Sequence, residues 1–83
     1  MNDQEARKNI LQKFYEAYKE HGLHVLVDAN SIRHSLGLDA SQAQRSFDYL
    51  SAKGLIKPMT LGGGYSPTVE LIDVIEQEAA GAQ

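Results

Sequence analysis

The chain has 83 residues, contains no cysteine and carries a formal net charge of −3 at pH 7. This length fits one small domain, residues 1–83, with a modest core, and the lack of cysteine excludes disulfide bonds and cysteine-ligated zinc. The sequence has no apolar signal segment and no run near the ~20 apolar residues of a membrane-spanning helix, so we expect a cytoplasmic protein with no membrane partner.

The charge is unevenly distributed along the chain. Residues 58–83 carry four acidic side chains and no basic one, whereas residues 21–57 carry four basic and three acidic side chains. The C-terminal part is therefore acidic and the middle is faintly basic, which matters more for a charged partner than the net charge does.

A first helix is predicted from about Asp3 to Glu20. Its apolar residues recur at helical spacing and form one stripe, made of Ile10, Leu11, Phe14, Ala17 and Tyr18. Asn2 and Glu5 fit a capping box at its start, and Gly22 fits the left-handed position after its end.

The next residues predict a short strand and a second helix. Residues 24–27 (HVLV) are apolar and partly β-branched, which favours a brief strand or extended segment. Asp28 fits the N-cap of a helix over about 29–36, and Gly37 fits its end.

The clearest local signals belong to a third helix over residues 40–53. Asp39 is a good N-cap, and Gln42 three residues later completes a capping box. Gly54 fits the left-handed position at the other end. The predicted core face of this helix consists of Ala43, Phe47 and Leu50.

A small β-hairpin is predicted after the third helix. Residues 55–61 supply its first strand, residues 62–64 its turn, and Tyr65 begins the return strand. Pro58 and Pro67 cannot donate ladder hydrogen bonds, so we expect a short two-stranded edge that lies on the helices.

A last helix is predicted over residues 69–80. Either Ser66 or Thr68 fits as its N-cap, and we expect residues 81–83 to be disordered. Its apolar residues cover one broad arc, made of Leu71, Ile72, Val74, Ile75 and Ala79.

The order of these elements indicates a helix-turn-helix followed by a wing. Two helices are joined by the short turn GLD, and a hairpin follows the second of them directly. The sequence resembles the winged-helix (winged helix-turn-helix) family of small prokaryotic transcriptional regulators, chiefly in SIRHSLGLDASQAQRSFDYLSAKGLI and LGGGYSPT. The resemblance implies a mostly α-helical fold with a small β-hairpin: a three-helix core, a two- to three-stranded wing sheet and a C-terminal helix.

The resemblance also implies binding to double-stranded DNA, with the helix over residues 40–53 in the major groove. Arg pairs with guanine edges and Gln with adenine edges, so we expect this helix to read bases through Ser41, Gln42, Gln44, Arg45 and Tyr49. We expect backbone phosphates to be held by Ser31, Arg33, His34, Lys53 and Lys57.

Charge sets two further expectations for this surface. Asp48 lies on the same face and would repel phosphate unless it pairs with Arg45 or accepts from a cytosine amino group. The few cations near the helix neutralise at most about four phosphates, so a monomer should bind weakly and a dimer should compensate. The expected dimer surfaces are the Tyr15 and Tyr18 edge of the first helix and the apolar arc of the last helix.

A second hypothesis is a winged-helix module that binds a protein partner and has no intrinsic DNA binding, which suits the acidic composition and the uncharged wing tip. We do not expect an enzyme, because the sequence shows no recognisable Ser, His and Asp pattern of a catalytic site. His21 and His24 lack a third ligand, and the glycines of residues 62–64 lack the lysine of a phosphate loop. We therefore expect no metal, cofactor or small-molecule ligand.

Overall fold

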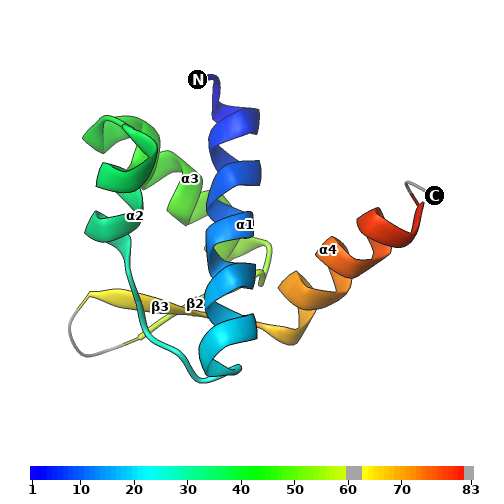
Figure 1. Cartoon of the computed structure of the whole chain (residues 1–83). Helices are drawn as coiled ribbons and strands as arrows, with labels where there is room; N and C mark the ends of the chain where they lie inside the picture. Colours follow the sequence, from blue (N-terminus) through cyan, green and yellow to red (C-terminus); the bar gives the residue numbers. More distant parts are fainter. Residues whose placement is uncertain (60–62, 82–83) are drawn as a thin grey trace.

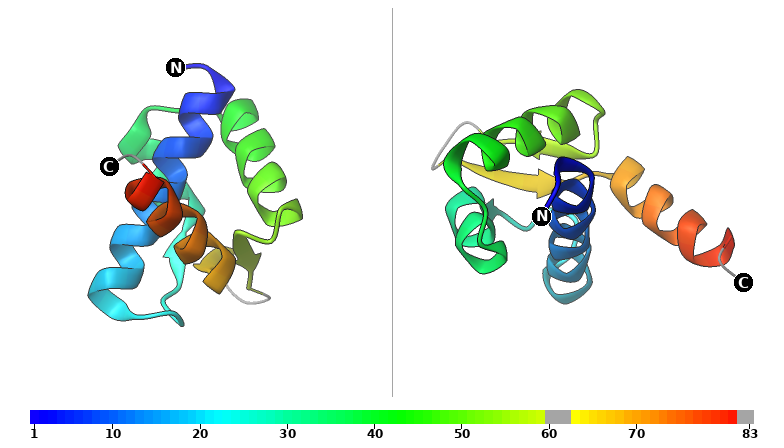
Figure 2. Two further views of the ribbon diagram at one scale, coloured as in Figure 1. Left: turned by 90° about the vertical axis from the view of Figure 1, so that its right-hand side faces the viewer. Right: turned by 90° about the horizontal axis from the view of Figure 1, so that it is seen from above.

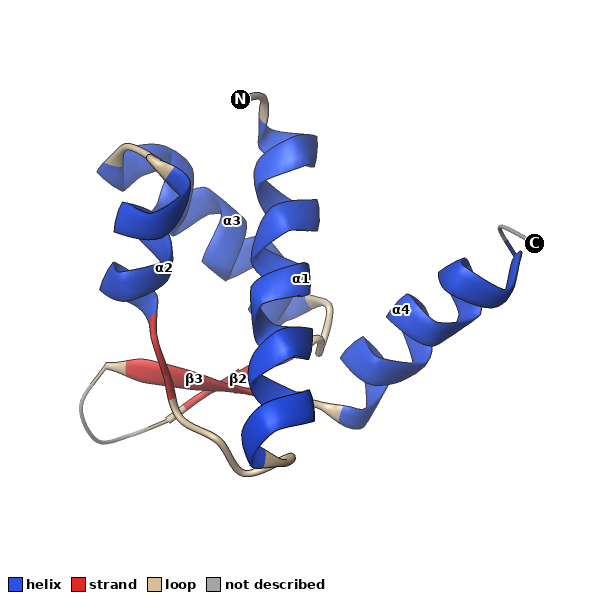
Figure 3. Ribbon diagram, in the orientation of Figure 1, coloured by secondary structure: helices blue, strands red, loops and turns tan. Residues whose placement is uncertain are grey.

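The structure is a computed structural model that describes residues 1–59 and 63–81 (Figure 1). Within these residues the chain forms four helices and three short strands, coloured by type in Figure 3. In chain order they are α1 (Asp3–His21), β1 (Val27–Asp28), α2 (Ala29–Leu36), α3 (Ala40–Ala52), β2 (Ile56–Pro58), β3 (Gly64–Pro67) and α4 (Val69–Gly81). The predicted fold class is confirmed: the chain is mostly helical with a small antiparallel sheet, an arrangement compatible with a winged-helix fold.

The helices begin where the polar residues before them predicted. The side chains of Asn2, Asp28 and Asp39 each accept a hydrogen bond from a backbone N–H of the first turn, at 2.8, 3.1 and 2.7 Å. These bonds satisfy donors that a helix leaves without an internal partner. Local sequence therefore determines where α1, α2 and α3 start.

Helix α3 ends in a tight left-handed turn at Gly54, one residue beyond its C-cap Lys53. Gly54 has φ +78°, and the N–H of Leu55 bonds to the carbonyl of Leu50 at 3.0 Å. Together with the 3.0 Å bond from Gly54 N to Ser51 O, this is a Schellman motif, in which glycine avoids the strain that a side chain would suffer. The turn directs the chain from α3 into β2.

The three strands form one antiparallel sheet in the order β1-β3-β2. The brief strand or extended segment predicted over residues 24–27 becomes a paired strand only at its end, because only Val27 and Asp28 pair with β3. The carbonyl of Val25 instead accepts from the Ser66 hydroxyl at 2.7 Å. This extra strand gives the sheet three strands where the hairpin alone predicted two.

The two prolines of the hairpin lie where a missing N–H is tolerated. Pro58 belongs to β2, an edge strand, and Pro67 is the last residue of β3, beyond the part that pairs with β1. The predicted turn over residues 62–64 needs correction, because Gly64 already lies in β3 opposite Asp28. The remainder of that predicted turn and the end of the first strand include residues 60–62, which lie outside the described residues.

The hydrophobic core lies between α1, α3 and the sheet. Phe14 meets Phe47 edge to face with ring centroids 6.4 Å apart, and Tyr65 stacks on Phe47 with ring centroids 5.1 Å apart. The largest fully buried side chains surround this stack and include Ile10, Leu50, Ile56 and Leu71. The aromatic contacts join the first helix, the third helix and the sheet into one packed unit.

Thr68 is the N-cap of helix α4, which resolves the choice between Ser66 and Thr68. The Thr68 hydroxyl accepts from the N–H of Leu71 at 3.3 Å and donates to the carbonyl of Gly54 at 2.6 Å. Leu71 and Ile72 are buried, while the rest of the helix extends away from the body (Figure 1). Of the predicted disordered tail, Gly81 belongs to α4 and residues 82–83 lie outside the described residues.

Among the described residues, no helix combines the length and the apolar character needed to cross a membrane.

Gly64 leaves no room for a side chain. A Cβ at this position would lie 2.7 Å from Leu26 Cδ1 and 3.0 Å from the carbonyl oxygen of Val27. We expect Gly64→Ala to destabilise the domain by about 1–3 kcal/mol, the usual cost of overpacking. Thermal unfolding followed by circular dichroism should show a Tm lower by about 4–8 °C for each kcal/mol.

Leu26→Ala provides the matched control, because the Leu26 side chain is 55% exposed and its truncation alone should cost little. In the double variant, part of the lost stability should return, since only the Val27 carbonyl still opposes the new methyl group. An unchanged Tm in Gly64→Ala would contradict this packing.

Candidate nucleic-acid interface

Helix α3 has a buried side and an exposed side. The buried side consists of Ala43, Ser46, Phe47 and Leu50. The apolar spacing predicted the burial of all of these except Ser46. The exposed side carries Ser41, Gln44, Arg45, Asp48 and Ala52, with Tyr49 at its edge. Ser46 shares the spacing of the core residues, but its polarity concealed its burial, and its hydroxyl has no hydrogen-bond partner among the described residues.

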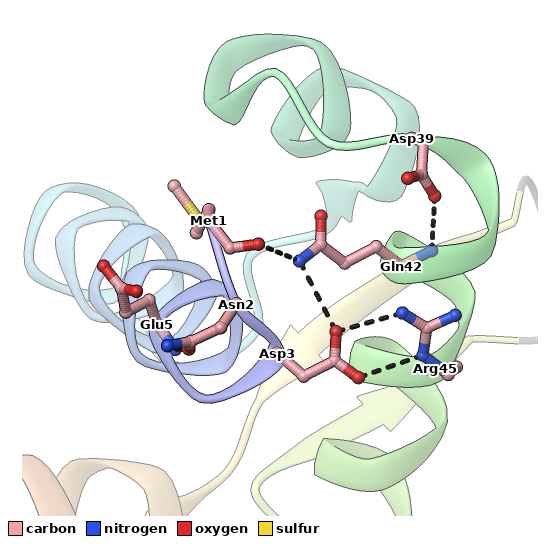
Figure 4. A network of polar contacts seen from close by, with 7 residues as sticks. All are labelled: Met1, Asn2, Asp3, Glu5, Asp39, Gln42 and Arg45. Carbon is pink, nitrogen blue, oxygen red and sulfur yellow. Dashed lines mark hydrogen bonds and ion pairs between the residues drawn. The ribbon is translucent and has the colours of Figure 1, made fainter.

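Hydrogen bonds hold the N-terminus of the chain against α3 (Figure 4). The Asp3 carboxylate accepts two hydrogen bonds from the Arg45 guanidinium, from Nε and Nη2, each 3.0 Å long. The Gln42 side-chain amide donates to the Met1 carbonyl at 2.6 Å and to Asp3 Oδ1 at 3.4 Å. Two predicted base-reading residues therefore contact the start of α1, and we refer to these bonds as the Asp3–Arg45 clasp.

The clasp corrects two expectations. Arg45 does not pair with Asp48; instead, Asp48 accepts from the Gln44 amide at 2.9 Å. The Gln42 side chain bonds to Met1 and Asp3, so only the Asp39 half of the predicted capping box is seen. Asp3 and Arg45 are separated by 42 positions in the chain, so local spacing carried no signal for their contact.

The clasp shifts the protonation equilibria of both partners. The hydrogen bonds from Arg45 lower the pKa of Asp3, and those to Asp3 raise the pKa of Arg45. Both side chains keep about half of their surface in solvent, with 59% of Arg45 and 40% of Asp3 exposed. Water therefore screens the pair, and another anion can reach the guanidinium and compete for it.

Two cations lie close to the ring of Tyr49. The Arg7 guanidinium lies 4.2 Å from the ring centroid and the Lys53 ammonium 5.7 Å from it. Tyr49 is 43% exposed, so this edge of α3 presents an aromatic surface flanked by positive charge. Arg7 was not among the predicted site residues, because its contact with α3 depends on how α1 packs.

The predicted phosphate-binding residues are only partly brought together. Arg33 and Gln44 line one small hollow of about 240 Å³ between α2, α3 and the sheet. Arg33 and His34 also interact with each other, with Nη2 and Nε2 3.2 Å apart, and Ser31 is exposed on α2. Lys57 instead lines a separate hollow beside Leu23 and Thr68, so it does not join the α3 group.

The N-terminus of α2 is less free for phosphate than its sequence suggested. The Asp28 carboxylate accepts from the N–H of Asn30 at 3.1 Å. It therefore places a negative charge at the helix end where an anion would bind. Across residues 1–59 and 63–81, no three His, Asp or Glu side chains come together as a potential set of metal ligands.

No family model, no curated protein and no solved structure matches this chain.

The clasp predicts a pH dependence for Asp3. Its folded pKa is depressed, so the pair stabilises the fold above the unfolded carboxyl pKa, and this contribution is lost as the pH falls through the folded pKa. We expect the NMR titration midpoint of the Asp3 carboxyl group to lie below the ordinary value of about 3.9. In Arg45→Gln the midpoint should rise, whereas Arg33→Gln should leave it unchanged. A normal midpoint in the native chain would contradict the clasp.

Proposed function

We propose that the chain binds double-stranded DNA through the exposed side of α3, as a winged-helix transcription regulator. The observation that carries the proposal is the row of Ser41, Gln44 and Arg45 on a helix capped at both ends and packed on the core. Such a helix, entered through a tight turn from α2, can place polar side chains at base edges without rearranging itself.

The side-chain chemistry suits the major groove. A guanidinium can donate two hydrogen bonds to guanine, and a glutamine amide can both donate to and accept from adenine. Arg33 lies across a small hollow from Gln44 and supplies a cation for the flanking phosphate. The contribution of charge is small: because Lys57 lies apart from the α3 group, the cations that remain are Arg33, Arg45 and Lys53, which correspond to a salt slope no steeper than about −3 on logarithmic scales.

Binding DNA requires an exchange of partners at α3. The Asp3 carboxylate holds the Arg45 fork in the bidentate manner that guanine or phosphate would use. Likewise, the Gln44 amide is held by Asp48. Each base contact therefore replaces an internal hydrogen bond, which reduces the net gain and favours a sequence that satisfies both groups at once.

The same internal bonds favour a second candidate, a module that binds a protein partner and not DNA. When the polar groups of the exposed helix are already paired within the chain, they add little to an electrostatic attraction for DNA. The two candidates differ in their response to nucleic acid at low salt.

A titration with random duplex DNA at low ionic strength, followed by NMR, tests the function. We expect backbone shifts along α3, and we expect Gln44→Ala combined with Arg45→Ala to weaken binding by about tenfold or more. Gln12→Ala combined with Lys13→Ala removes one glutamine and one cation from α1 and should leave affinity nearly unchanged. Absence of any shift on α3 in the native chain at low salt would reject DNA binding and leave the protein-partner candidate.

Releasing the clasp should strengthen binding. In Asp3→Asn, Arg45 loses its anionic partner and becomes free for DNA, so the affinity for duplex should rise by up to about fivefold. Glu5→Gln removes the same charge two residues along α1 without touching Arg45, and fluorescence anisotropy compares the two. Equal gains in both variants would assign the effect to general charge and not to the clasp.

A further inference from the structure

A cleft of about 660 Å³ opens where α4 diverges from α1, with the C-terminal half of α3 at its base. Figure 2 shows this divergence from above, with α4 pointing away from the N-terminal half of α1. The cleft has an apolar floor, contributed by Leu11, Leu50 and Leu55. Its size lies within the range of about 300–1,000 Å³ that is typical of binding sites.

The two walls of the cleft carry opposite charges. Arg7 and Lys8 from α1 and Lys53 from α3 form a basic wall. Glu70, Val74 and Glu78 from α4 form an acidic stripe at four-residue spacing along one side of the helix. The ion pairs found among the described residues are Arg45–Asp3 and His21–Glu20, so no ion pair joins the basic wall to the acidic stripe.

Two other sides of α4 make contacts within the chain, while Asp73 and Gln77 are exposed. Leu71 and Ile72 are buried against the body. On the α1 side, Glu76 accepts from the Tyr15 hydroxyl at 3.1 Å, and Tyr15 stacks on Tyr18 with centroids 6.1 Å apart. The acidic stripe is thus the part of α4 that faces the open cleft.

An occupant with charge of one sign would be attracted by one wall and repelled by the other. The chain itself has the required combination, because each copy carries both an acidic stripe and a basic wall. In a two-fold pair, every contact between residue i and residue j occurs twice, so the stripe of each copy can meet the wall of the other.

We propose that the cleft is a self-association surface, in which a second copy of the chain places the Glu70–Val74–Glu78 stripe of its α4 against Arg7, Lys8 and Lys53. The proposal replaces the Tyr15 and Tyr18 edge expected from the sequence, since those rings are engaged with each other and with α4. Ser41, Gln44 and Arg45 lie outside the cleft lining and remain accessible in such a pair, whereas Tyr49 and Lys53 line the cleft and are covered by the second copy. The inference does not depend on DNA binding, and its test uses no DNA.

Sedimentation velocity across a range of protein concentrations tests the pairing. The native chain should form a dimer at low ionic strength that weakens as salt is added. Reversing the basic wall with Arg7→Glu and Lys8→Glu, or the acidic stripe with Glu70→Lys and Glu78→Lys, should raise the dissociation constant by about 100-fold, because like charges then oppose each other.

The decisive sample is an equimolar mixture of the two reversed variants. In a mixed pair both contacts regain opposite charges, so the mixture should dimerise although neither variant does alone. Lys13→Glu with Lys19→Glu reverses two charges elsewhere on α1 and should dimerise like the native chain. Circular dichroism verifies that each variant is folded.

Two results would overturn the proposal. One is a native chain that stays monomeric at NMR concentrations and low ionic strength. The other is a native dimer with a mixture that remains monomeric, which would locate the interface elsewhere. Neither result decides whether α3 binds DNA, which is measured separately by the NMR titration.

Discussion

The ring of Phe47 contacts two other aromatic rings, edge to face with Phe14 of α1 and stacked with Tyr65 of β3. This contact fixes α3 by its inner side, so its outer side is presented to solvent in one orientation. Strands of two to four residues have little stability of their own, so the sheet depends on packing against the helices, and this stack is one of its contacts with them. Both the polar row on α3 and the Arg7–Tyr49 edge depend on this single packed arrangement.

Local chemistry predicted most of the fold. Asn2, Asp28 and Asp39 mark helix starts because a side-chain oxygen and the N–H it accepts lie two or three residues apart. The same reasoning did not locate β1, because a two-residue strand is defined by its partner β3 and not by its own sequence. The burial of Ser46 was missed for a related reason: helical spacing assigned its position to the core side, but its polarity suggested the surface.

The candidate site was predictable in composition but not in its internal bonding. Helical geometry correctly placed Ser41, Gln44 and Arg45 on the exposed side of α3. The partner of Arg45 depends on how α1 crosses α3, and no pattern within α3 contains that information. The outcome is a surface on which Gln44 and Arg45 are already hydrogen-bonded before any ligand arrives. Any ligand of such a surface competes with internal hydrogen-bond partners of similar chemistry. This competition increases the specificity of binding more than its affinity.

The Thr68 hydroxyl has a consequence for the geometry of any assembly. This one oxygen bonds both to the carbonyl of Gly54, in the turn after α3, and to the first turn of α4. It therefore links the two helices. The bonds of Thr68 fix the start of α4 and so the direction in which α4 leaves the rest of the domain. If α4 joins two copies, the distance between their α3 helices follows from that angle. Two reading helices must lie about 34 Å apart to meet successive turns of B-DNA. If α3 reads DNA, a change in the position of Thr68 would therefore change the spacing of the half-sites without altering any residue that faces a base.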